Sequence, residues 1–385
     1  MLRFIKRLSY FFLLLLFCGT RGLAQENVQI SILTCAPGEA IYSVFGHSAI
    51  RIVDYERGTD VIYDFGSFNF DTPNFALKFL KGKLKYHLGK RNPERFIQEY
   101  SLENRLVEEQ VLNLNAEQKQ QIIDQLNYMF LPENRYYYYS FLEKNCSTDL
   151  RDLLEKVGVS FRKAPLDLSK RDQINDYMKE KPWLRFGVNL ILGTKLDVQS
   201  SEYQSMFLPD YLRNEIEEAS NGEQPLVASF SDLNSQYPME EGGLLSWLSP
   251  LVLFSALLLI CLLRFPRFMQ GLVCLVIGLI GLLIVSLWLF SDHPEVKNNW
   301  MLLLFNPLYL LYIPLIIKRQ ANRLLTNLLA VTLIGGVLVW VLGVQAVDIG
   351  LVPFILLMGL IHFKQLRMAS SETLQVESVI QSENE

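Results

Sequence analysis

Histidine and cysteine are scarce in this sequence, since its 385 residues include only 4 histidines and 5 cysteines. No C-x-x-C pair occurs and no His/Cys cluster has metal-ligand spacing, which argues against a zinc site and against metal cofactors in general. The net charge of −4 is small for this length and argues against a nucleic-acid partner, which would need a basic patch. Internal repeats and low-complexity segments are also missing. The length is enough for two domains of ordinary size.

Apolar residues are concentrated in particular segments, and this divides the chain. Residues 1–24 combine a basic start, an apolar run and small residues, which is the pattern of a secretory signal peptide. An uncleaved N-terminal anchor is the alternative. Residues 25–243 mix polar and apolar side chains and predict a soluble domain, whereas residues 244–367 predict a transmembrane helical domain. Residues 368–385 are polar and acidic, and we expect a disordered cytoplasmic tail.

The C-terminal domain contains several segments that approach the ~20 apolar residues of a spanning helix. The predicted spans are Leu244–Leu263, Phe268–Phe290, Trp300–Ile317, Leu324–Val344 and Gly350–Phe363. Basic residues follow the first, third and fifth of them, and the opposite loops are acidic. The positive-inside rule then predicts a multi-pass protein of the inner (cytoplasmic) membrane whose soluble domain is periplasmic. No Asp, Glu, Lys or Arg lies deep in these spans, which argues against an ion-coupled transporter.

The soluble region is predicted to be an α+β domain with a small antiparallel sheet. Alternating apolar residues predict strands around Val28–Ile32, Ser48–Asp54, Asp60–Gly66 and Val107–Leu114, the second and third forming a hairpin. Residues 74–88 and 92–100 are predicted to form short helices. Two further helices are expected, one from an Asn115 N-cap to about Met129 and one over Ser147–Val157, which stops at Gly158.

One cysteine and one histidine of this domain suggest nucleophilic chemistry. Cys146 follows Asn145, a candidate N-cap, so the cysteine is placed where backbone N–H groups stabilise a thiolate and can bind an oxyanion. His47 opens a predicted strand after Gly46 and is a candidate base. Asp64 on the neighbouring strand is the preferred residue to orient the imidazole, as the third member of a catalytic triad does.

Simpler interpretations of these residues stay open at this point. Cys146 is equally consistent with an ordinary buried cysteine, or with a disulfide to Cys35, the other cysteine that follows the signal segment in the soluble region. His47 is consistent with a structural histidine. Asp54 and Asp71 are alternatives to Asp64. A closed zinc site needs four ligands, and these residues have no companions.

Four segments of the sequence carry a resemblance to a known family. They are Phe45–Arg51 (FGHSAIR), Tyr63–Phe68 (YDFGSF), Thr72–Phe75 (TPNF) and Tyr137–Thr148 (YYYSFLEKNCST). A histidine that precedes the cysteine in this way resembles the circularly permuted papain-like (NlpC/P60-type) fold. More closely, these segments and the membrane spans that follow resemble the Bacteroidota-type lipoprotein N-acyltransferases, the Lnb family. The resemblance covers most of residues 26–365.

The resemblance implies a cysteine-dependent acyltransferase without a cofactor. Its partners would be the lipid bilayer, a membrane phospholipid as acyl donor and a diacylated lipoprotein as acceptor, with Cys146, His47 and Asp64 as the catalytic residues. Candidates for oxyanion or substrate contacts are Asn145, Ser147, Arg51 and Arg151; salt bridges are the alternative role for the two arginines. The competing hypotheses are a lipid hydrolase or cell-wall amidase on the same fold, and a non-enzymatic membrane-anchored assembly module.

Overall fold

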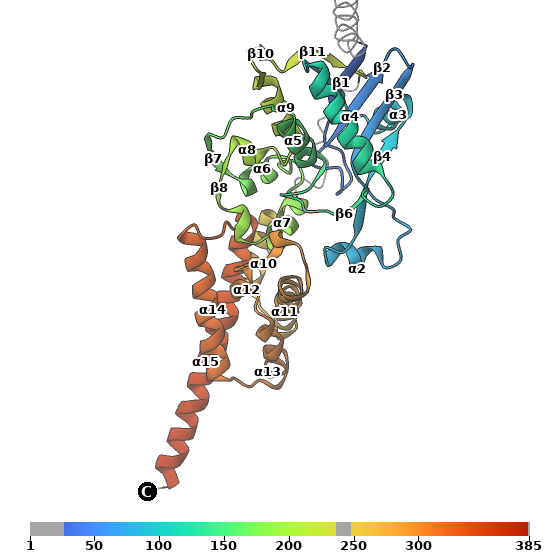
Figure 1. Ribbon diagram of the computed structural model, residues 1–385. Helices are drawn as coiled ribbons and strands as arrows, with labels where there is room; N and C mark the ends of the chain where they lie inside the picture. The colour runs from blue at the N-terminus through green and yellow to red at the C-terminus, as the bar shows by residue number, and fades with distance from the viewer. Residues whose placement is uncertain (1–26, 236–247, 384–385) are drawn as a thin grey trace, which may run out of the picture. The chain divides into compact units, whose positions relative to one another are not determined.

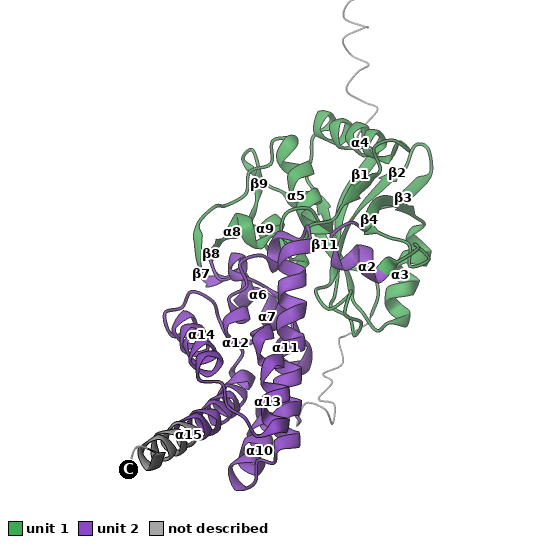
Figure 2. Cartoon of the chain, turned by 90° about the horizontal axis from the view of Figure 1, so that it is seen from below, with its two compact units in different colours: residues 1–75, 84–166, 200–239 green, residues 76–83, 167–199, 240–385 purple. Residues whose placement is uncertain are grey.

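A computed structural model describes residues 27–235 and 248–383 (Figure 1). The predicted signal segment and the start of the first predicted span, residues 244–247, lie outside the described residues. The chain forms two compact units, coloured separately in Figure 2. We call residues 1–75, 84–166 and 200–239 the sheet unit, and residues 76–83, 167–199 and 240–385 the helical unit.

The sheet unit is built on a seven-stranded antiparallel sheet with the strand order β11-β5-β1-β2-β3-β4-β6. Its strands are β1 (Val28–Cys35), β2 (His47–Asp54), β3 (Thr59–Ser67), β4 (Lys85–Arg91), β5 (Val107–Leu112), β6 (Tyr136–Tyr138) and β11 (Val227–Asp232). The α+β class, the antiparallel sheet and the β2–β3 hairpin are confirmed. One prediction was wrong: the end of the 74–88 segment is strand β4, because Tyr86 and Leu88 alternate into the buried side of the sheet.

Helices of the sheet unit flank this sheet. They are α3 (Pro93–Leu102), α4 (Ala116–Phe130), α5 (Cys146–Lys156), α8 (Glu202–Ser205) and α9 (Pro209–Glu218). Asn115 caps α4 as predicted, with a reciprocal hydrogen bond to Gln118. Small two-stranded pairs join β9 (Ser220–Asn221) to β10 (Gln224–Pro225) and β7 (Pro165–Ser169) to β8 (Gln199–Ser201).

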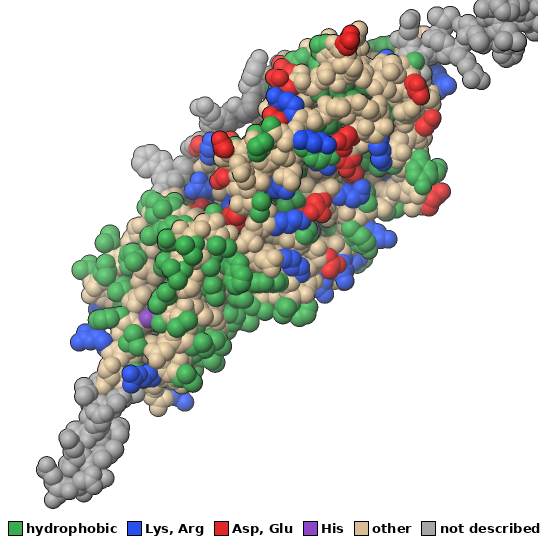
Figure 3. All heavy atoms as spheres, turned by 60° about the vertical axis from the view of Figure 1, so that its left-hand side comes forward, with side chains coloured by type: hydrophobic (Ala, Val, Ile, Leu, Met, Phe, Trp, Pro, Cys, Tyr) green, Lys and Arg blue, Asp and Glu red, His purple; other side chains and the backbone are tan. Residues whose placement is uncertain are grey.

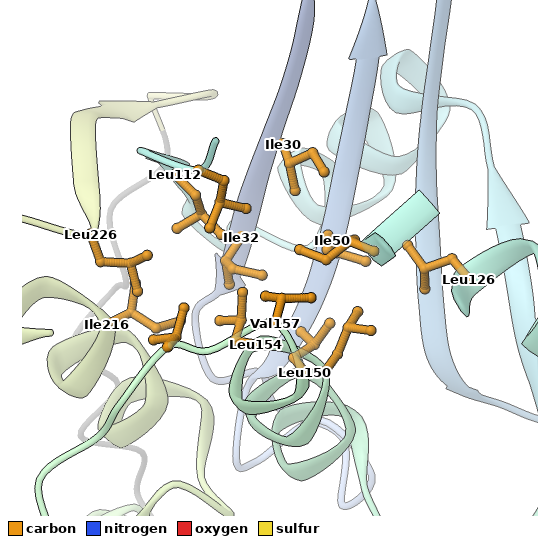
Figure 4. Close-up of a cluster of buried hydrophobic side chains, with 14 of the residues drawn as sticks. Ile30, Ile32, Ile50, Leu112, Leu126, Leu150, Leu154, Val157, Ile216 and Leu226 are labelled. Carbon is orange, nitrogen blue, oxygen red and sulfur yellow. The ribbon is translucent and has the colours of Figure 1, made fainter. Parts of the chain in front are cut away.

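Alternate residues of the central strands enter two separate cores, since successive side chains of a strand point to opposite faces. On one face Ile30, Ile32 and Ile50 pack with α4, α5 and α9 (Figure 4). The helix residues labelled there are Leu126, Leu150, Leu154 and Ile216. The other face buries a smaller cluster that includes Cys35, Ala49 and Phe96 of α3. The first core holds α5 firmly against the sheet, which positions its N-terminus.

The helical unit contains the apolar C-terminal half of the chain. Its helices are α10 (Pro250–Leu263), α11 (Arg267–Phe290), α12 (Met301–Leu304), α13 (Tyr312–Lys318), α14 (Arg323–Val341) and α15 (Val352–Glu383). Single turns occur at η3 (Pro294–Val296), η4 (Pro307–Leu311) and η5 (Ile349–Leu351). Hydrophobic side chains cover the face of this unit drawn in Figure 3, as expected for a surface that meets lipid.

Four segments of the described chain are long and apolar enough to cross a membrane: Arg267–Phe290, Met301–Lys318, Arg323–Val341 and Ile349–Ser370. The first predicted span contains α10, which is apolar but has only 14 described residues. At the C-terminus α15 continues to Glu383, unlike the disordered tail that its composition predicts. No Gly or Pro interrupts residues 364–383, so nothing in the sequence stops the helix there.

The second candidate span is broken rather than continuous. The interruption falls at Phe305 and Asn306, where Pro307 starts the turn η4 and Asn306 accepts a hydrogen bond from the Leu308 N–H. Gly281 of α11 allows this irregular backbone to approach, because a Cβ there would lie 2.1 Å from the Phe305 carbonyl oxygen. Irregular backbone at membrane depth is tolerated where protein buries it, as here.

Residues 167–199 belong to the helical unit although the sequence places them in the soluble region. They form α6 (Lys170–Asp176), α7 (Pro182–Ile191) and the turn η1 (Thr194–Leu196). Arg171 of α6 is almost fully buried, pairs with Asp197 at 2.6 Å and donates to the carbonyls of Leu192 and Gly193. Gln345, from the loop after α14, donates to the same Leu192 carbonyl at 3.1 Å. This buried polar network joins the segment to the bundle.

Candidate functional site

Three residues distant in sequence meet at one end of the sheet. His47 is the first residue of β2, Asp64 lies on the neighbouring strand β3, and Cys146 is the first residue of α5. The His47 Nε2 lies 2.6 Å from the Asp64 Oδ1, and the imidazole and the Cys146 thiol are close enough that each shifts the pKa of the other. With Nε2 held by the carboxylate, the other ring nitrogen, Nδ1, is left available for proton transfer. The structure therefore brings together the three residues that the sequence suggested.

Local backbone geometry sets the position of His47. Gly46 has φ +74°, a conformation that suits glycine, and an added Cβ there would lie 2.7 Å from the Cys35 carbonyl oxygen. The tight turn at Gly46 leads directly into β2, where His47 pairs with Cys35 of β1. A larger residue at position 46 would displace the start of the strand and with it the imidazole.

Asn145 fixes the start of α5 and so the position of Cys146. Its side-chain oxygen accepts from the N–H groups of Ser147 and Thr148, each at 2.9 Å. Its side-chain nitrogen donates to the carbonyls of Phe141 and Phe207 at 2.7 and 2.8 Å. Both amide protons are thus used within the protein, and the side chain acts as a buried N-cap. Asn145 therefore has no amide proton left to donate to an oxyanion, which was the role suggested for it.

The surroundings of Cys146 favour the thiolate. Burial alone would raise the pKa of its thiol, but the charge and hydrogen bond of His47 outweigh burial and lower that pKa below its ordinary value. The Ser48 backbone and the Ser147 hydroxyl, whose Oγ lies 3.9 Å from the sulfur, act in the same direction. The helix N-terminus adds a favourable dipole. Cys146 is therefore poised as a nucleophile.

His47 is the cationic partner of this thiolate. Burial would lower the pKa of its imidazole, but the charges of Cys146 and Asp64, with hydrogen bonds to both, raise it to about 10. For the Asp64 carboxyl, burial would raise the pKa, and the charge and hydrogen bond of His47 outweigh it and lower the pKa. These shifts all favour an imidazolium between a Cys146 thiolate and the Asp64 carboxylate.

Asp64 is also held by residues that the sequence did not point to. The Arg91 Nη1 on β4 and the Ser67 hydroxyl on β3 each lie 3.4 Å from its Oδ2. The Tyr137 hydroxyl of β6 accepts from the N–H of Gly66, two residues beyond Asp64. No sequence signal pointed to Arg91, because its proximity depends on the pairing of β4 with β3.

The remaining sequence candidates are bound to other protein groups. Arg51 forms a double hydrogen bond with Asp60, at 2.9 and 2.6 Å, and also pairs with Glu109 at 3.2 Å. Arg151 donates to Asp152 at 2.7 and 2.8 Å and lies over the ring of Tyr203. Both arginines thus make the salt bridges that were the alternative to a role in lipid binding.

The other candidates near the site are also placed. Ser147 is buried and its hydroxyl lies 3.1 Å from that of Ser48, which ties α5 to β2. Asp54 accepts from the backbone of the β2–β3 turn, and Asp71 lies in an exposed turn, so neither takes the position beside His47. Cys35 and Cys146 are both free thiols, so the disulfide considered for them is not formed.

The arrangement is suited to covalent acyl transfer. A thiolate, an imidazolium that can return a proton and a carboxylate that orients the ring are the parts needed to form and resolve a thioester. Within residues 27–235 and 248–383 no three His, Cys, Asp or Glu side chains lie together in a way that would hold a metal ion.

Two family models match this chain. The model described as the Lnb N-terminal periplasmic domain matches residues 18–175, which include all three residues of the site. The model described as the Lnb transmembrane domain matches residues 243–371, which include the four candidate spans. No curated protein and no solved structure is detectably similar to the chain.

Proposed function

Because this chain belongs to the Lnb family, with a periplasmic domain and a transmembrane domain, we propose that it is a lipoprotein N-acyltransferase of the inner membrane. In this proposal it moves an acyl chain from a membrane phospholipid to the α-amino group of a diacylglyceryl-cysteine lipoprotein. The observation that carries the proposal is the Cys146–His47–Asp64 arrangement at the N-terminus of α5. A periplasmic site attached to a membrane bundle also suits two substrates that both reside in a bilayer.

The first half-reaction transfers the acyl chain to the enzyme. The Cys146 thiolate attacks the ester carbonyl carbon of the phospholipid, and the carbonyl oxygen becomes an oxyanion. The first turn of a helix presents backbone N–H groups, and that of Cys146 itself is the one we assign to this oxyanion. The ester C–O bond then breaks, the His47 imidazolium gives its proton to the departing oxygen, and a lysophospholipid leaves. The product is a thioester on Cys146.

The second half-reaction delivers the chain to the acceptor. The neutral α-amine of the lipoprotein attacks the thioester carbonyl, His47 accepts the proton that the amine loses, and the C–S bond breaks. The amide bond forms and Cys146 returns to its thiolate state. Asp64 keeps its charge throughout and holds the imidazole so that its second nitrogen stays directed at the sulfur.

The fold of the sheet unit is consistent with a circularly permuted papain-like arrangement. In this chain the histidine strand precedes the cysteine helix, and α5 packs against the strands that carry His47 and Asp64. We include this fold relationship in the proposal, because a nucleophile at a helix N-terminus facing a histidine on a strand suits the same thiol chemistry.

Mass spectrometry of lipoprotein N-termini tests the proposed reaction. Cells that lack this protein receive the wild-type chain, Cys146→Ala or Cys35→Ala, the last as a control that removes a different thiol of the same unit. We expect the third acyl chain to return with wild type and Cys35→Ala and to stay absent with Cys146→Ala at equal membrane levels. Unchanged N-termini in every strain, with no second enzyme present, would exclude this acceptor. Free fatty acid release would instead support a lipid hydrolase, and cleaved peptidoglycan amides would support an amidase.

A further inference from the structure

A short helix between β3 and β4 exposes large apolar side chains. This helix, α2 (Phe75–Leu80), has no buried residue. Leu77, Phe79 and Leu80 are 52%, 48% and 44% exposed. Six residues are too few for a helix to be stable on its own in water, and such exposed apolar side chains need a partner. In Figure 2 most of this helix has the colour of the helical unit, to which residues 76–83 belong.

The carbonyl groups at the end of α2 are bound to the residues that directly follow α11. The Leu80 carbonyl accepts from the Ser291 hydroxyl at 2.7 Å, and the Lys81 carbonyl accepts from the Asp292 N–H at 3.0 Å. His293 contacts the Phe79 carbonyl through its Nε2 at 2.8 Å. Three successive carbonyls are therefore held by three successive residues beyond the end of a candidate span.

These contacts set the depth of α2 relative to the bilayer. The candidate span α11 ends at Phe290, so residues 291–293 lie where the chain leaves the hydrocarbon region. Trp288, two residues before that end, packs edge-on against Trp300 at a ring-centroid separation of 6.2 Å. Indole rings prefer the membrane interface, which supports this assignment of depth.

The charges of the segment fit a phospholipid surface. Lys78 lies between Leu77 and Phe79, Lys81 and Lys83 follow Leu80, and Lys83 lies 3.9 Å from Asp292. An apolar helix flanked by lysines is the pattern of an interfacial segment, in which the apolar side chains enter the acyl region and ammonium groups meet phosphates. A soluble protein partner would not explain why the segment is bound at the end of a span.

We propose that residues 76–83 form an interfacial membrane segment that inserts Leu77, Phe79 and Leu80 into the outer leaflet of the bilayer. Lys78 and Lys81 then contact the phosphates of phospholipid headgroups. The segment lies in the connection between β3, which carries Asp64, and β4, which carries Arg91. The inference rests on the membrane position of the helical unit and is independent of which acceptor receives the acyl chain.

Site-specific photocrosslinking tests the insertion. The full chain, with p-benzoylphenylalanine in place of Phe79, is reconstituted in nanodiscs of phosphatidylcholine and phosphatidylglycerol, irradiated and analysed by mass spectrometry. The matched control carries the same residue in place of Tyr128 of α4, which is 59% exposed. We expect a phospholipid adduct at position 79 at least about tenfold more abundant than at position 128. Equal adducts at both positions, or adducts to protein alone at position 79, would overturn the proposal.

A pair of glycine variants tests the role of the contact with residues 291–293. Gly82 has φ +68°, and an added Cβ there would lie 3.2 Å from the His293 backbone nitrogen. Gly58 has φ +61° with nothing within 4 Å of an added Cβ, so Gly58→Ala carries a similar backbone cost without the close contact. We expect Gly82→Ala to reduce the Phe79 adduct several-fold and Gly58→Ala to leave it unchanged. Equal yields of the Phe79 adduct from the two variants would show that the contact with residues 291–293 does not hold the segment at the membrane.

The same measurement in a Cys146→Ala background separates this proposal from the proposed reaction. That variant is expected to abolish transfer and to retain the lipid adduct at position 79. If a chain that retains transfer activity showed no lipid adduct at position 79, the proposed membrane insertion would be wrong and the proposed reaction would stand.

Discussion

His47 and Asp64 are 17 positions apart in the chain, yet the His47 Nε2 and the Asp64 Oδ1 are separated by only 2.6 Å. The β2–β3 hairpin brings the two residues together, and α5 brings Cys146 close to the same imidazole. The order of these contacts gives each residue a separate role. The carboxylate acts on the sulfur only through the imidazole, which leads to the first prediction.

Replacing Asp64 with Asn should preserve the shape of the site and remove its charge. The pKa of His47 should fall from about 10, since the Asp64 charge and hydrogen bond contribute to raising it. We expect transfer to fall roughly 10-fold to 1,000-fold, because the imidazolium is less stable. Asp60→Asn is the control, since Asp60 lies on the same strand and pairs with Arg51 instead. Equal activity of Asp64→Asn and wild type would contradict the assigned role.

The pH dependence of Cys146 alkylation should report the thiolate–imidazolium pair. The thiolate exists above the lowered pKa of Cys146, and the imidazolium exists below the His47 pKa of about 10. The rate of acyl transfer should therefore be maximal between these two pKa values and decline on either side. The rate of reaction with iodoacetamide should rise at a lower pH than it does for an ordinary cysteine thiol. In His47→Gln the alkylation profile should shift to higher pH, because the largest contribution that opposes the effect of burial on the thiol pKa is then lost. A profile that His47→Gln leaves unchanged would refute the pairing.

Removing the Asn145 cap should destabilise the sheet unit more than removing the cap of α4. Asn145→Ala loses two capping bonds and leaves the Phe141 and Phe207 carbonyls without this donor, a loss of about 3 kcal/mol. Asn115→Ala removes a more exposed cap, at a cost of about 1 kcal/mol. Thermal unfolding in detergent measures both. Similar midpoints for the two variants would show that the buried bonds add little.

Arg171→Met should loosen the attachment of residues 167–199 to the helical bundle. The substitution leaves Asp197 and two backbone carbonyls buried without their charged partner, and breaking a buried pair costs about 3–5 kcal/mol. Lys179→Met is the control, because its ion pair with Asp176 is exposed and contributes about 0–1 kcal/mol. Limited proteolysis between residues 167 and 199 should accelerate only in Arg171→Met. Unchanged proteolysis would indicate that other contacts hold the segment.

The sequence by itself determined the features that depend on neighbouring residues. Asn145 before Cys146 predicts a capped helix because capping joins residues only two or three positions apart. Alternation predicts the β2–β3 hairpin, and long apolar runs predict spans, because burial in a sheet or a bilayer imposes a local pattern. The residue types alone also suggested His47 and Cys146 as a pair, and the resemblance supported that choice.

Only the tertiary structure decided the features that depend on contacts between distant segments. The choice of Asp64 over Asp54 and Asp71, and the approach of Arg91 to it, follow from how β2, β3 and β4 align. Residues 76–83 and 167–199 join the helical unit through hydrogen bonds to residues more than a hundred positions away. Hydrogen bonds of this kind depend on where two chain segments meet in space, and neither segment alone carries a pattern that specifies the other.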